Sequence, residues 1–443
     1  MTLCPKKFAD QLFGELALDQ DSTFYVAYSG GVDSHVLLSL MAQARLQHGF
    51  NLEALHVNHK LQDESSLWAT HCMKICAAMD VPLHQTALDL ASNSESAARV
   101  GRYQWFAEQV LHNNVLLTGH HQQDRTETLL FNLMRGAGSA GLSGLRKIRP
   151  FHRSKLVRPM LGYSKQDVLD YAKLQRLQWV DDPSNQHNGY SRNHIRNKII
   201  PHLTQFRVDA ICNISRAADN LEGENSILRE VAISDLVEIS EHPKHPYDGS
   251  HALCFQDMQH LSKNRQANVV RFWLNSLNLH IPSKRLLNDL LLAFRTPPLG
   301  SAVLQENGFQ FRFYRGFMYA MPALHNDDSF STIDWNDLDQ PIDLYKKKIR
   351  VDATDKLRKL FHSDRFSSPL GANLKLASRA KIENPKALQG HSLNLKNWLQ
   401  DMGVPPWRRQ DLPLLTLSQS NMDVVLCPID QQMQSDWVLL GCP

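Results

Sequence analysis

The chain lacks most of the short motifs that would assign a function at a glance. None of its 443 residues belong to an apolar run of about 18, the length that a membrane-spanning helix needs. A Gly-Lys-Ser/Thr tripeptide is absent, which excludes a Walker A loop, and no third glycine completes a dinucleotide-binding fingerprint. Low-complexity blocks, repeats and a signal-peptide pattern are also missing, so we expect a soluble, cytoplasmic protein.

Cysteine usage excludes further classes of protein. The seven cysteines include no Cys-x-x-Cys pair, so the usual thiolate pairs of zinc, iron–sulfur and redox sites are missing. Cys72 and Cys76 lie four residues apart on a predicted helix beside His71. A metal site there would need three or four converging ligands, whereas two inward-facing core thiols need nothing further. We therefore interpret this pair as part of the core.

Charge is balanced overall but unevenly distributed. The formal net charge is +3, yet residues 135–198 hold thirteen Lys or Arg against four Asp or Glu. A solvated basic face is the usual reason for such a bias. Because this stretch also contains Trp179, Tyr190 and several histidines, a surface that faces RNA is a second interpretation.

One glycine-containing segment stands between an apolar, strand-like run at 24–28 and a helical pattern at 35–42. Such a turn presents free backbone N–H groups and a helix N-terminus, which together bind anions. Two adjacent glycines let the backbone approach a ligand closely. The segment therefore predicts a nucleotide phosphate site, and its string is similar to the pyrophosphate loop (PP-loop) of the ATP pyrophosphatases. In this chain the segment consists of Ser29, Gly30, Gly31, Val32, Asp33 and Ser34.

Strand and helix patterns alternate from residue 24 to about residue 215. This alternation predicts a parallel sheet with helices on both faces, whose ligands bind beyond the carboxyl ends of the strands. Three segments should meet at that edge: residues 29–34, 56–59 and 119–124. Polar residues at 56–59 are consistent with contacts to a base or ribose, or with a histidine metal pair.

Carboxylates and arginines supply the candidate catalytic groups. Asp124 and Glu127 fall one helical turn apart, which suits Mg²⁺ held against phosphate oxygens or, alternatively, an acidic helix start favoured by the helix dipole. The pairs Arg99 with Arg102 and Arg192 with Arg196 are each spaced to share a helix face and meet phosphate. Between them, the glycine-rich stretch 135–145 predicts a flexible loop, either a lid or a plain linker.

Later residues change character. Helical patterns at 227–239, 264–277 and 283–294 predict a small, mostly helical domain, followed by a hairpin at 309–320. An acidic, irregular stretch at 326–341 suits a linker, and residues 342–443 suggest a small α+β domain. Near its centre, residues 403–409 form a rigid basic segment that suits RNA binding or packing between domains. We expect domains at 1–215, 216–330 and 342–443.

Taken in order, these segments resemble the tRNA(Ile)-lysidine synthetase family along nearly the whole chain. The matching segments are 29–34, 56–59, 98–103, 119–128, 135–145, 158–159, 182–185, 192–196 and 404–408. Departures are Gln123, where the family usually has an acidic residue, Arg125, where it usually has Gln, and Gln62, in place of a common Arg. The first departure leaves Asp124 with Glu127 as the candidate magnesium carboxylates.

The resemblance implies an adenine nucleotide α-hydrolase-like catalytic domain that modifies the wobble cytidine of the CAU anticodon of tRNA(Ile). ATP adenylates the C2 oxygen and releases pyrophosphate; L-lysine then attacks C2 and releases AMP. Implied roles are ATP binding for Ser29–Ser34, Mg²⁺ binding or catalytic positioning for Asp33 and Asp124, and support for Glu127. Arg192 and Arg196 would contact the intermediate or RNA, and Arg99 and Arg102 the RNA.

Two alternatives remain at this point. A tRNA 2-thiolation enzyme shares the loop, but such enzymes depend on reactive or cluster-binding cysteines, typically in the Cys-x-x-Cys pair that is absent here. A non-catalytic, nucleotide-dependent RNA-binding module would not need the carboxylates. The oligomeric state is left open, with a homodimer among the possibilities.

Overall fold

A computed structural model gives the arrangement of the chain. It divides into two compact units, residues 1–227 and 228–443, which are described one at a time. The structure describes residues 3–58, 65–88, 95–180, 191–241, 252–279, 282–296, 303–306, 308–323, 333–334, 342–344, 349–351, 373–378, 397, 400, 405–409, 413–419, 422–428 and 437–439.

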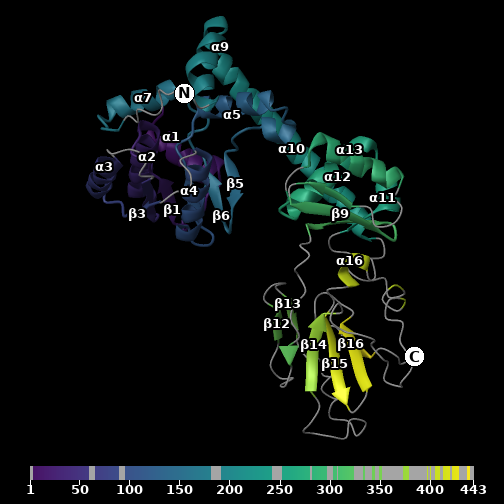
Figure 1. Cartoon of the computed structure of the whole chain (residues 1–443). Coiled ribbons are helices and arrows are strands. Elements are labelled where there is room, and N and C mark those ends of the chain that lie inside the picture. Colours follow the sequence, from purple (N-terminus) through teal and green to yellow (C-terminus); the bar gives the residue numbers. More distant parts are fainter. Residues whose placement is uncertain are drawn as a thin grey trace. The chain divides into compact units, whose positions relative to one another are not determined.

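The first unit contains a six-stranded sheet with the strand order β3-β2-β1-β4-β6-β5 (Figure 1). Neighbouring strands are parallel, except that the edge strand β5 runs antiparallel to β6. The predicted parallel sheet is therefore confirmed, and a hairpin that the sequence patterns had not indicated extends it. The strands are β1 (Phe24–Ala27), β2 (Leu52–Asn58), β3 (Leu83–Ala87), β4 (Val115–Leu117), β5 (Ile148–Phe151) and β6 (Ser154–Val157).

The predicted helical pattern at 35–42 lies in α2 (Val32–His48), and the predicted helix that carries Cys72 and Cys76 is α3 (Ser65–Ala78). The unit also contains several short helices. The glycine-rich stretch contains one of these, α6, and the Asn132 side chain donates a hydrogen bond to the Gly141 carbonyl at 2.8 Å. The helices are α1 (Pro5–Asp10), α2 (Val32–His48), α3 (Ser65–Ala78), α4 (Glu95–Gln109), α5 (Gln122–Met134), α6 (Ser139–Leu142), α7 (Lys165–Leu174), α8 (Ser191–His194) and α9 (Ile200–Phe206), with π-helical turns η1 (Gln11–Glu15) and η3 (Ile195–Ile199).

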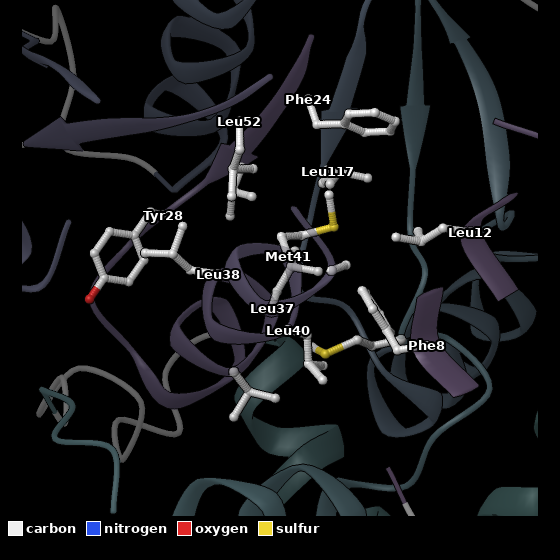
Figure 2. Packing of buried hydrophobic residues seen from close by; sticks show 14 of the residues in the cluster. Phe8, Leu12, Phe24, Tyr28, Leu37, Leu38, Leu40, Met41, Leu52 and Leu117 are labelled. Carbon is white, nitrogen blue, oxygen red and sulfur yellow. The ribbon is translucent and has the colours of Figure 1, made fainter. Parts of the chain in front are cut away.

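Side chains of the central strands alternate between two cores, one on each face of the sheet. Phe24 and Leu117 pack with α2, and Figure 2 shows Met41 of that helix beside them. Tyr25 and Leu116 face the opposite way and pack with α4. Helices α2 and α4 therefore cover opposite faces of the sheet.

The thiols of Cys72 and Cys76 are buried and free, as the sequence predicts for core cysteines. Burial raises the pKa of each to about 12, and Cys76 adds to this effect at Cys72. Both thiols are therefore protonated at neutral pH.

Helix α10 (Ala210–Glu241) begins in the first unit and ends in the second. The second unit contains the predicted helices and the predicted hairpin, and its sheet has the order β7-β10-β9-β8. Its remaining elements in this part are β7 (Ala252–Cys254), α11 (Phe255–His260), α12 (Lys263–Ser276), α13 (Lys284–Arg295), β8 (Val303–Glu306), β9 (Phe309–Tyr314) and β10 (Phe317–Pro322).

The last part of the second unit contains an antiparallel sheet, β11-β14-β15-β16-β17, and a strand pair, β12 with β13. Together with helix α16 this agrees with the expected α+β class. The predicted linker 326–341 lies mostly outside the described residues. The elements are β11 (Ile333–Asp334), β12 (Ile342–Leu344), β13 (Ile349–Val351), β14 (Asn373–Ser378), α16 (Pro406–Arg409), β15 (Pro413–Gln419), β16 (Met422–Pro428) and β17 (Trp437–Leu439).

The basic segment around Trp407 packs against β9 and β10. The indole of Trp407 is buried and makes edge contacts with the rings of Tyr314 and Tyr319, with centroids 6.1 and 5.5 Å apart. The Arg312 guanidinium lies over the same indole, 5.4 Å from its centroid. Of the two interpretations of this segment, packing therefore applies to Trp407. Among the described helices, none is long and apolar enough to cross a membrane.

Candidate active site

The predicted phosphate loop forms the turn between β1 and α2. Gly30 has φ of +85°, a conformation that favours glycine, and Gly31 is the N-cap residue that precedes the first residue of α2, Val32. The hydroxyls of Ser29 and Ser34 lie 3.0 Å apart, and the Ser34 hydroxyl also accepts a bond from the Ser29 N–H and donates one to the Gly31 carbonyl. The loop is therefore fixed by its own side chains, with the first-turn amides of α2 at its end.

Gly119 brings the end of β4 against the backbone of this loop. A Cβ atom at residue 119 would lie 2.8 Å from the carbonyl oxygen of Asp33 and 3.1 Å from the Ser34 nitrogen. Only a residue without a side chain permits this approach. The close contact brings the residues that follow, His120 and His121, beside the loop.

Asp33 lies between two cationic or potentially cationic groups. Its Oδ1 accepts a hydrogen bond from Lys165 Nζ at 2.5 Å, and the same oxygen is 3.6 Å from His121 Nε2. Lys165 is the first residue of α7, and both members of the ion pair are about one third exposed. The carboxylate is thus reachable from solvent.

Asp124 continues the same arrangement at the start of α5. Its Oδ2 accepts a hydrogen bond from the His121 N–H at 2.9 Å and lies 3.4 Å from His121 Nε2. His121 is 3% exposed, and its Nδ1 is buried without a hydrogen-bond partner. Two carboxylates from different elements therefore converge on one histidine ring nitrogen.

Arg196 joins Asp124 to Glu127. Its Nη2 donates to Asp124 Oδ1 at 3.2 Å, and its Nε and Nη2 donate to the two oxygens of Glu127 at 2.6 and 2.8 Å. Two parallel bonds between a guanidinium and a carboxylate give a strong, directional pair. The six side chains form one row, which we call the charged row: Lys165, Asp33, His121, Asp124, Arg196 and Glu127.

Burial affects the two carboxylates of α5 differently. Burial raises the pKa of Glu127, and the bonds from Arg196 only partly oppose this effect. At Asp124 burial also raises the pKa, but the charges of His121, His120 and Arg196 and the N–H of His121 outweigh it. The pKa of Asp124 therefore lies below its ordinary value, and that carboxyl group is ionised at neutral pH.

The predicted arginines divide into two groups. Arg192 and Arg196 both reach α5, since Arg192 Nη2 donates to Thr128 Oγ1 at 2.7 Å. Arg99 instead stacks over Tyr103, 5.1 Å from its ring centroid, and Arg102 lies half-buried on the same helix, α4. The structure thus places Arg196 in the charged row, Arg192 against α5 and Arg99 at Tyr103.

Other predicted segments contribute less. His56 is buried and its Nδ1 lies 2.9 Å from the Tyr28 carbonyl, so it braces the backbone just before the loop. Residue 59, the departure at Gln62 and the segment 182–185 lie outside the described residues.

Sequence reasoning did not single out Lys165 as a site residue, and it included Gly119 and His121 only as part of the segment 119–124 expected at the ligand-binding edge. Lys165 begins a helix far along the chain, and nothing local indicates that it reaches Asp33. A signal was available for Gly119, because a glycine directly after a buried strand often marks a close approach of two backbones. A row of carboxylates with cationic or potentially cationic groups between them, beside an anion-binding turn, can bind a phosphorylated ligand and orient a second polar substrate.

Comparison with known proteins shows which family models and solved structures the chain matches. Three family models match the chain in sequence: a PP-loop domain over residues 5–203, a TilS substrate binding domain over residues 253–319 and a TilS substrate C-terminal domain over residues 378–437. Among solved structures, the U34-tRNA thiolase NcsA from Methanococcus maripaludis aligns with a TM-score of 0.42 and 19% identity, over 49% of this chain and 78% of that one.

Relatives of known name match almost from end to end. The tRNA(Ile)-lysidine synthase of Coxiella burnetii is 30% identical over 425 residues, or 92% of this chain and 89% of the relative. That of Alkalilimnicola ehrlichii is 34% identical over 426 residues, or 94% of this chain and 92% of the relative. On these matches, the chain belongs to the tRNA(Ile)-lysidine synthase family.

Proposed function

We propose that this protein is a cytoplasmic ligase that joins L-lysine to C2 of the wobble cytidine in the CAU anticodon of tRNA(Ile). In the first step the C2 oxygen attacks the α-phosphate of ATP, and pyrophosphate leaves. In the second step the lysine amine attacks C2, and AMP leaves with the former C2 oxygen. The observation that carries the proposal is the joining of the phosphate loop to the charged row through the contacts of Asp33.

The loop is proposed to hold ATP. Its glycines and the N-terminus of α2 present backbone N–H groups to the phosphates. The loop needs little rearrangement when ATP binds, because the hydroxyls of Ser29 and Ser34 already fix the turn. Donors fixed in place before the reaction stabilise the charge that develops on the phosphates as the α–β link breaks.

Asp33 and Asp124 are proposed to position the reactants and to hold Mg²⁺ when it is bound. No group of three or more His, Cys, Asp or Glu that could hold a metal occurs among the described residues. Mg²⁺ does not need one, since one or two carboxylates with water and phosphate oxygens complete its shell. The two carboxylates that converge on His121 fit this requirement. A bound magnesium ion would neutralise phosphate charge.

Glu127 is proposed to act through Arg196. Its two hydrogen bonds fix the guanidinium beside Asp124, where a cation can meet the phosphate of the adenylated intermediate or of the RNA. Arg192 is assigned the same kind of contact, one helical turn away. The lysine substrate would be the second polar ligand of this site.

We also propose the domain division 1–215, 216–330 and 342–443. The order of the three family models along the chain supports it, as does the change from parallel to antiparallel sheets. The first domain would carry the chemistry, and the other two would bind the RNA.

The activity is tested with radiolabelled lysine, ATP and a transcript of the CAU-anticodon tRNA(Ile). Label incorporated into RNA with one AMP per lysine supports the proposal. Failure to incorporate lysine refutes it. Sulfur incorporation would favour the thiolation alternative, and nucleotide-dependent RNA binding without any turnover would favour the binding module.

A further inference from the structure

Three arginines gather around one tyrosine next to the charged row. The guanidinium of Arg99 lies 5.1 Å from the ring centroid of Tyr103, and that of Arg149 lies 5.6 Å from the same centroid. Arg158 is 3% exposed, and its Nη1 donates to the Arg146 carbonyl at 2.8 Å. We call Arg99, Arg149 and Arg158 with Tyr103 the arginine cluster.

The positive charge of this cluster is not balanced within the part of the chain that the structure describes. No Asp or Glu there forms an ion pair with Arg99, Arg149 or Arg158. The Nε atoms of Arg149 and Arg158 are buried without a hydrogen-bond partner. Burial lowers the pKa of Arg158 to about 10, and the charges of Arg149 and Arg99 contribute to that reduction, while the hydroxyl of Tyr103, which hydrogen-bonds the Arg158 side chain, opposes it.

Like charges held together with unpaired donors are costly unless an anion joins them. A guanidinium matches the oxygens of a phosphate group in both charge and planar geometry. The ring of Tyr103 keeps Arg99 and Arg149 in place through cation–π contacts, so the donors are ordered before a ligand arrives.

The cluster and the phosphate loop lie on different elements of the sheet. Arg158 follows β6, whose last residue, Val157, accepts a hydrogen bond from the Thr118 N–H at the end of β4. Arg149 pairs across the hairpin with Leu156, which belongs to the core on the α4 face. The loop leads instead into α2 on the opposite face. Nucleotide phosphates already have a site at the loop, so the cluster is available to a different phosphate.

His120 is close enough to feel the charges of both groups of residues. Its Nδ1 lies 2.8 Å from the Thr118 hydroxyl at the end of β4. Burial lowers its pKa to about 3, and the charges of Arg158 and Arg99 add to this reduction, while Asp124 acts in the opposite direction.

From this geometry we propose that Arg99, Arg149 and Arg158 bind one backbone phosphate of the substrate RNA, held beside the charged row. The proposal deepens the function proposed above, because it assigns the site to the RNA that is modified. The step involves binding only, and no bond is made or broken at the cluster.

Arg149→Gln is the decisive variant, and Arg153→Gln is its matched control. Arg153 is an exposed cation in the turn of the same β5–β6 hairpin and contacts His112 instead of the cluster. Binding of the tRNA(Ile) transcript is measured by filter retention between about 50 and 200 mM KCl. Binding of ATP is measured separately, and melting temperatures confirm that each variant is folded.

Loss of one phosphate contact should weaken RNA binding about 5- to 10-fold near 0.1 M salt and lower the salt-dependence slope by about one. The double variant Arg99→Gln with Arg149→Gln should lose the same single unit of slope, because both residues serve one phosphate. Arg153→Gln should match the wild type, and ATP affinity should stay unchanged in all variants.

The proposal is overturned if Arg149→Gln behaves like Arg153→Gln, if the double variant loses two units of slope, or if ATP affinity falls while RNA binding does not. These readings do not depend on turnover. A wild type that binds RNA with the expected slopes but incorporates no lysine would refute the proposed reaction and leave the phosphate site standing.

Discussion

The guanidinium of Arg196 donates two hydrogen bonds to Glu127, from Nε to Oε1 at 2.6 Å and from Nη2 to Oε2 at 2.8 Å. Glu127 is 1% exposed, whereas Arg196 is about one third exposed. The charge of the buried Glu127 carboxylate therefore needs its partner more than the charge of Arg196 does, because water can solvate the arginine. Because burial already raises the pKa of Glu127, removing Arg196 would raise it further.

Arg196→Ala should therefore lower the free energy of unfolding by about 1–3 kcal/mol, since it leaves the buried Glu127 carboxylate with only the long bond from Gln123, at 3.4 Å. Adding Glu127→Gln to the same variant should recover part of this loss, because the uncompensated charge is then gone. Urea denaturation of the two variants measures the difference. Equal stability of the two variants would show that the Glu127 charge carries no cost once Arg196 is gone, which contradicts this account.

Asp33→Ala should abolish AMP formation while tRNA affinity stays unchanged. The carboxylate stands at the phosphate loop with Lys165, so its loss removes the group that links the nucleotide to the charged row. Asp170→Asn, an exposed carboxylate on the same helix as Lys165, is the control and should turn over normally. Appreciable turnover by Asp33→Ala, measured as AMP release, would remove Asp33 from the catalytic groups.

Gly119→Ala should raise the KM for ATP and destabilise the fold by about 1–3 kcal/mol. The added methyl group would meet the Asp33 carbonyl oxygen at 2.8 Å and force the loop backbone to move. Gly223→Ala in α10, where nothing lies within 4 Å of the new carbon, should be stabilising by about 0.5–1 kcal/mol. A Gly119→Ala enzyme with unaltered ATP kinetics would mean that the close approach does not shape the loop.

Removing Arg125 and removing its two carboxylate partners should lower the free energy of unfolding by different amounts. Its side chain is 1% exposed and donates to Asp219 at 2.5 Å and to Glu222 at 3.2 Å, both on α10 and both partly solvated. Removing both carboxylates, as Asp219→Asn with Glu222→Gln, should cost about 3–5 kcal/mol because a buried cation is left uncompensated. Arg125→Gln should cost less, because water can reach both carboxylates. The reverse order in thermal or urea unfolding would contradict this account.

His35 should make stability depend on pH in mildly acidic solution. Burial lowers its pKa to about 4 from an ordinary value near 6.5, so below that ordinary value the unfolded chain takes up a proton that the folded chain does not. The contribution of neutral His35 to the free energy of unfolding is complete above about pH 6.5. It decreases as the pH falls towards about 4, with a slope of up to about 1.4 kcal/mol per pH unit. Urea unfolding between these pH values should show a shallower dependence for His35→Gln. An identical slope would assign the effect to other groups.

Much of the first unit could be predicted because its signals are local. Apolar β-rich runs and helical spacing are properties of short segments, so β1, β2, β4 and their helices follow from the sequence. The pairing of Asp124 with Glu127 on one face follows from helix geometry in the same way. Spacing also places Arg192 and Arg196 on one face, but it does not say which element they meet.

The partners that complete the site depend on tertiary contacts. Lys165 reaches Asp33 across 132 residues, and Arg125 reaches α10 across more than ninety. The β5–β6 hairpin was not predicted because its strands, unlike β1 and β4, are not continuous apolar runs and lie in a basic stretch that suggested a surface. That hairpin carries Arg149, and Arg158 follows it, so the arginine cluster could not be assembled from Arg99 alone.

Cys72 lies directly behind the phosphate loop, since a Cβ atom on Gly30 would come within 3.0 Å of its sulfur. A bulky adduct on that sulfur would push the turn out of shape. Its thiol, however, stays protonated at neutral pH, and protonated thiols are poor nucleophiles. Alkylating reagents and mild oxidants should therefore modify the exposed Cys212 before the buried Cys72, which makes Cys212 a position for a spectroscopic label that leaves the phosphate loop intact.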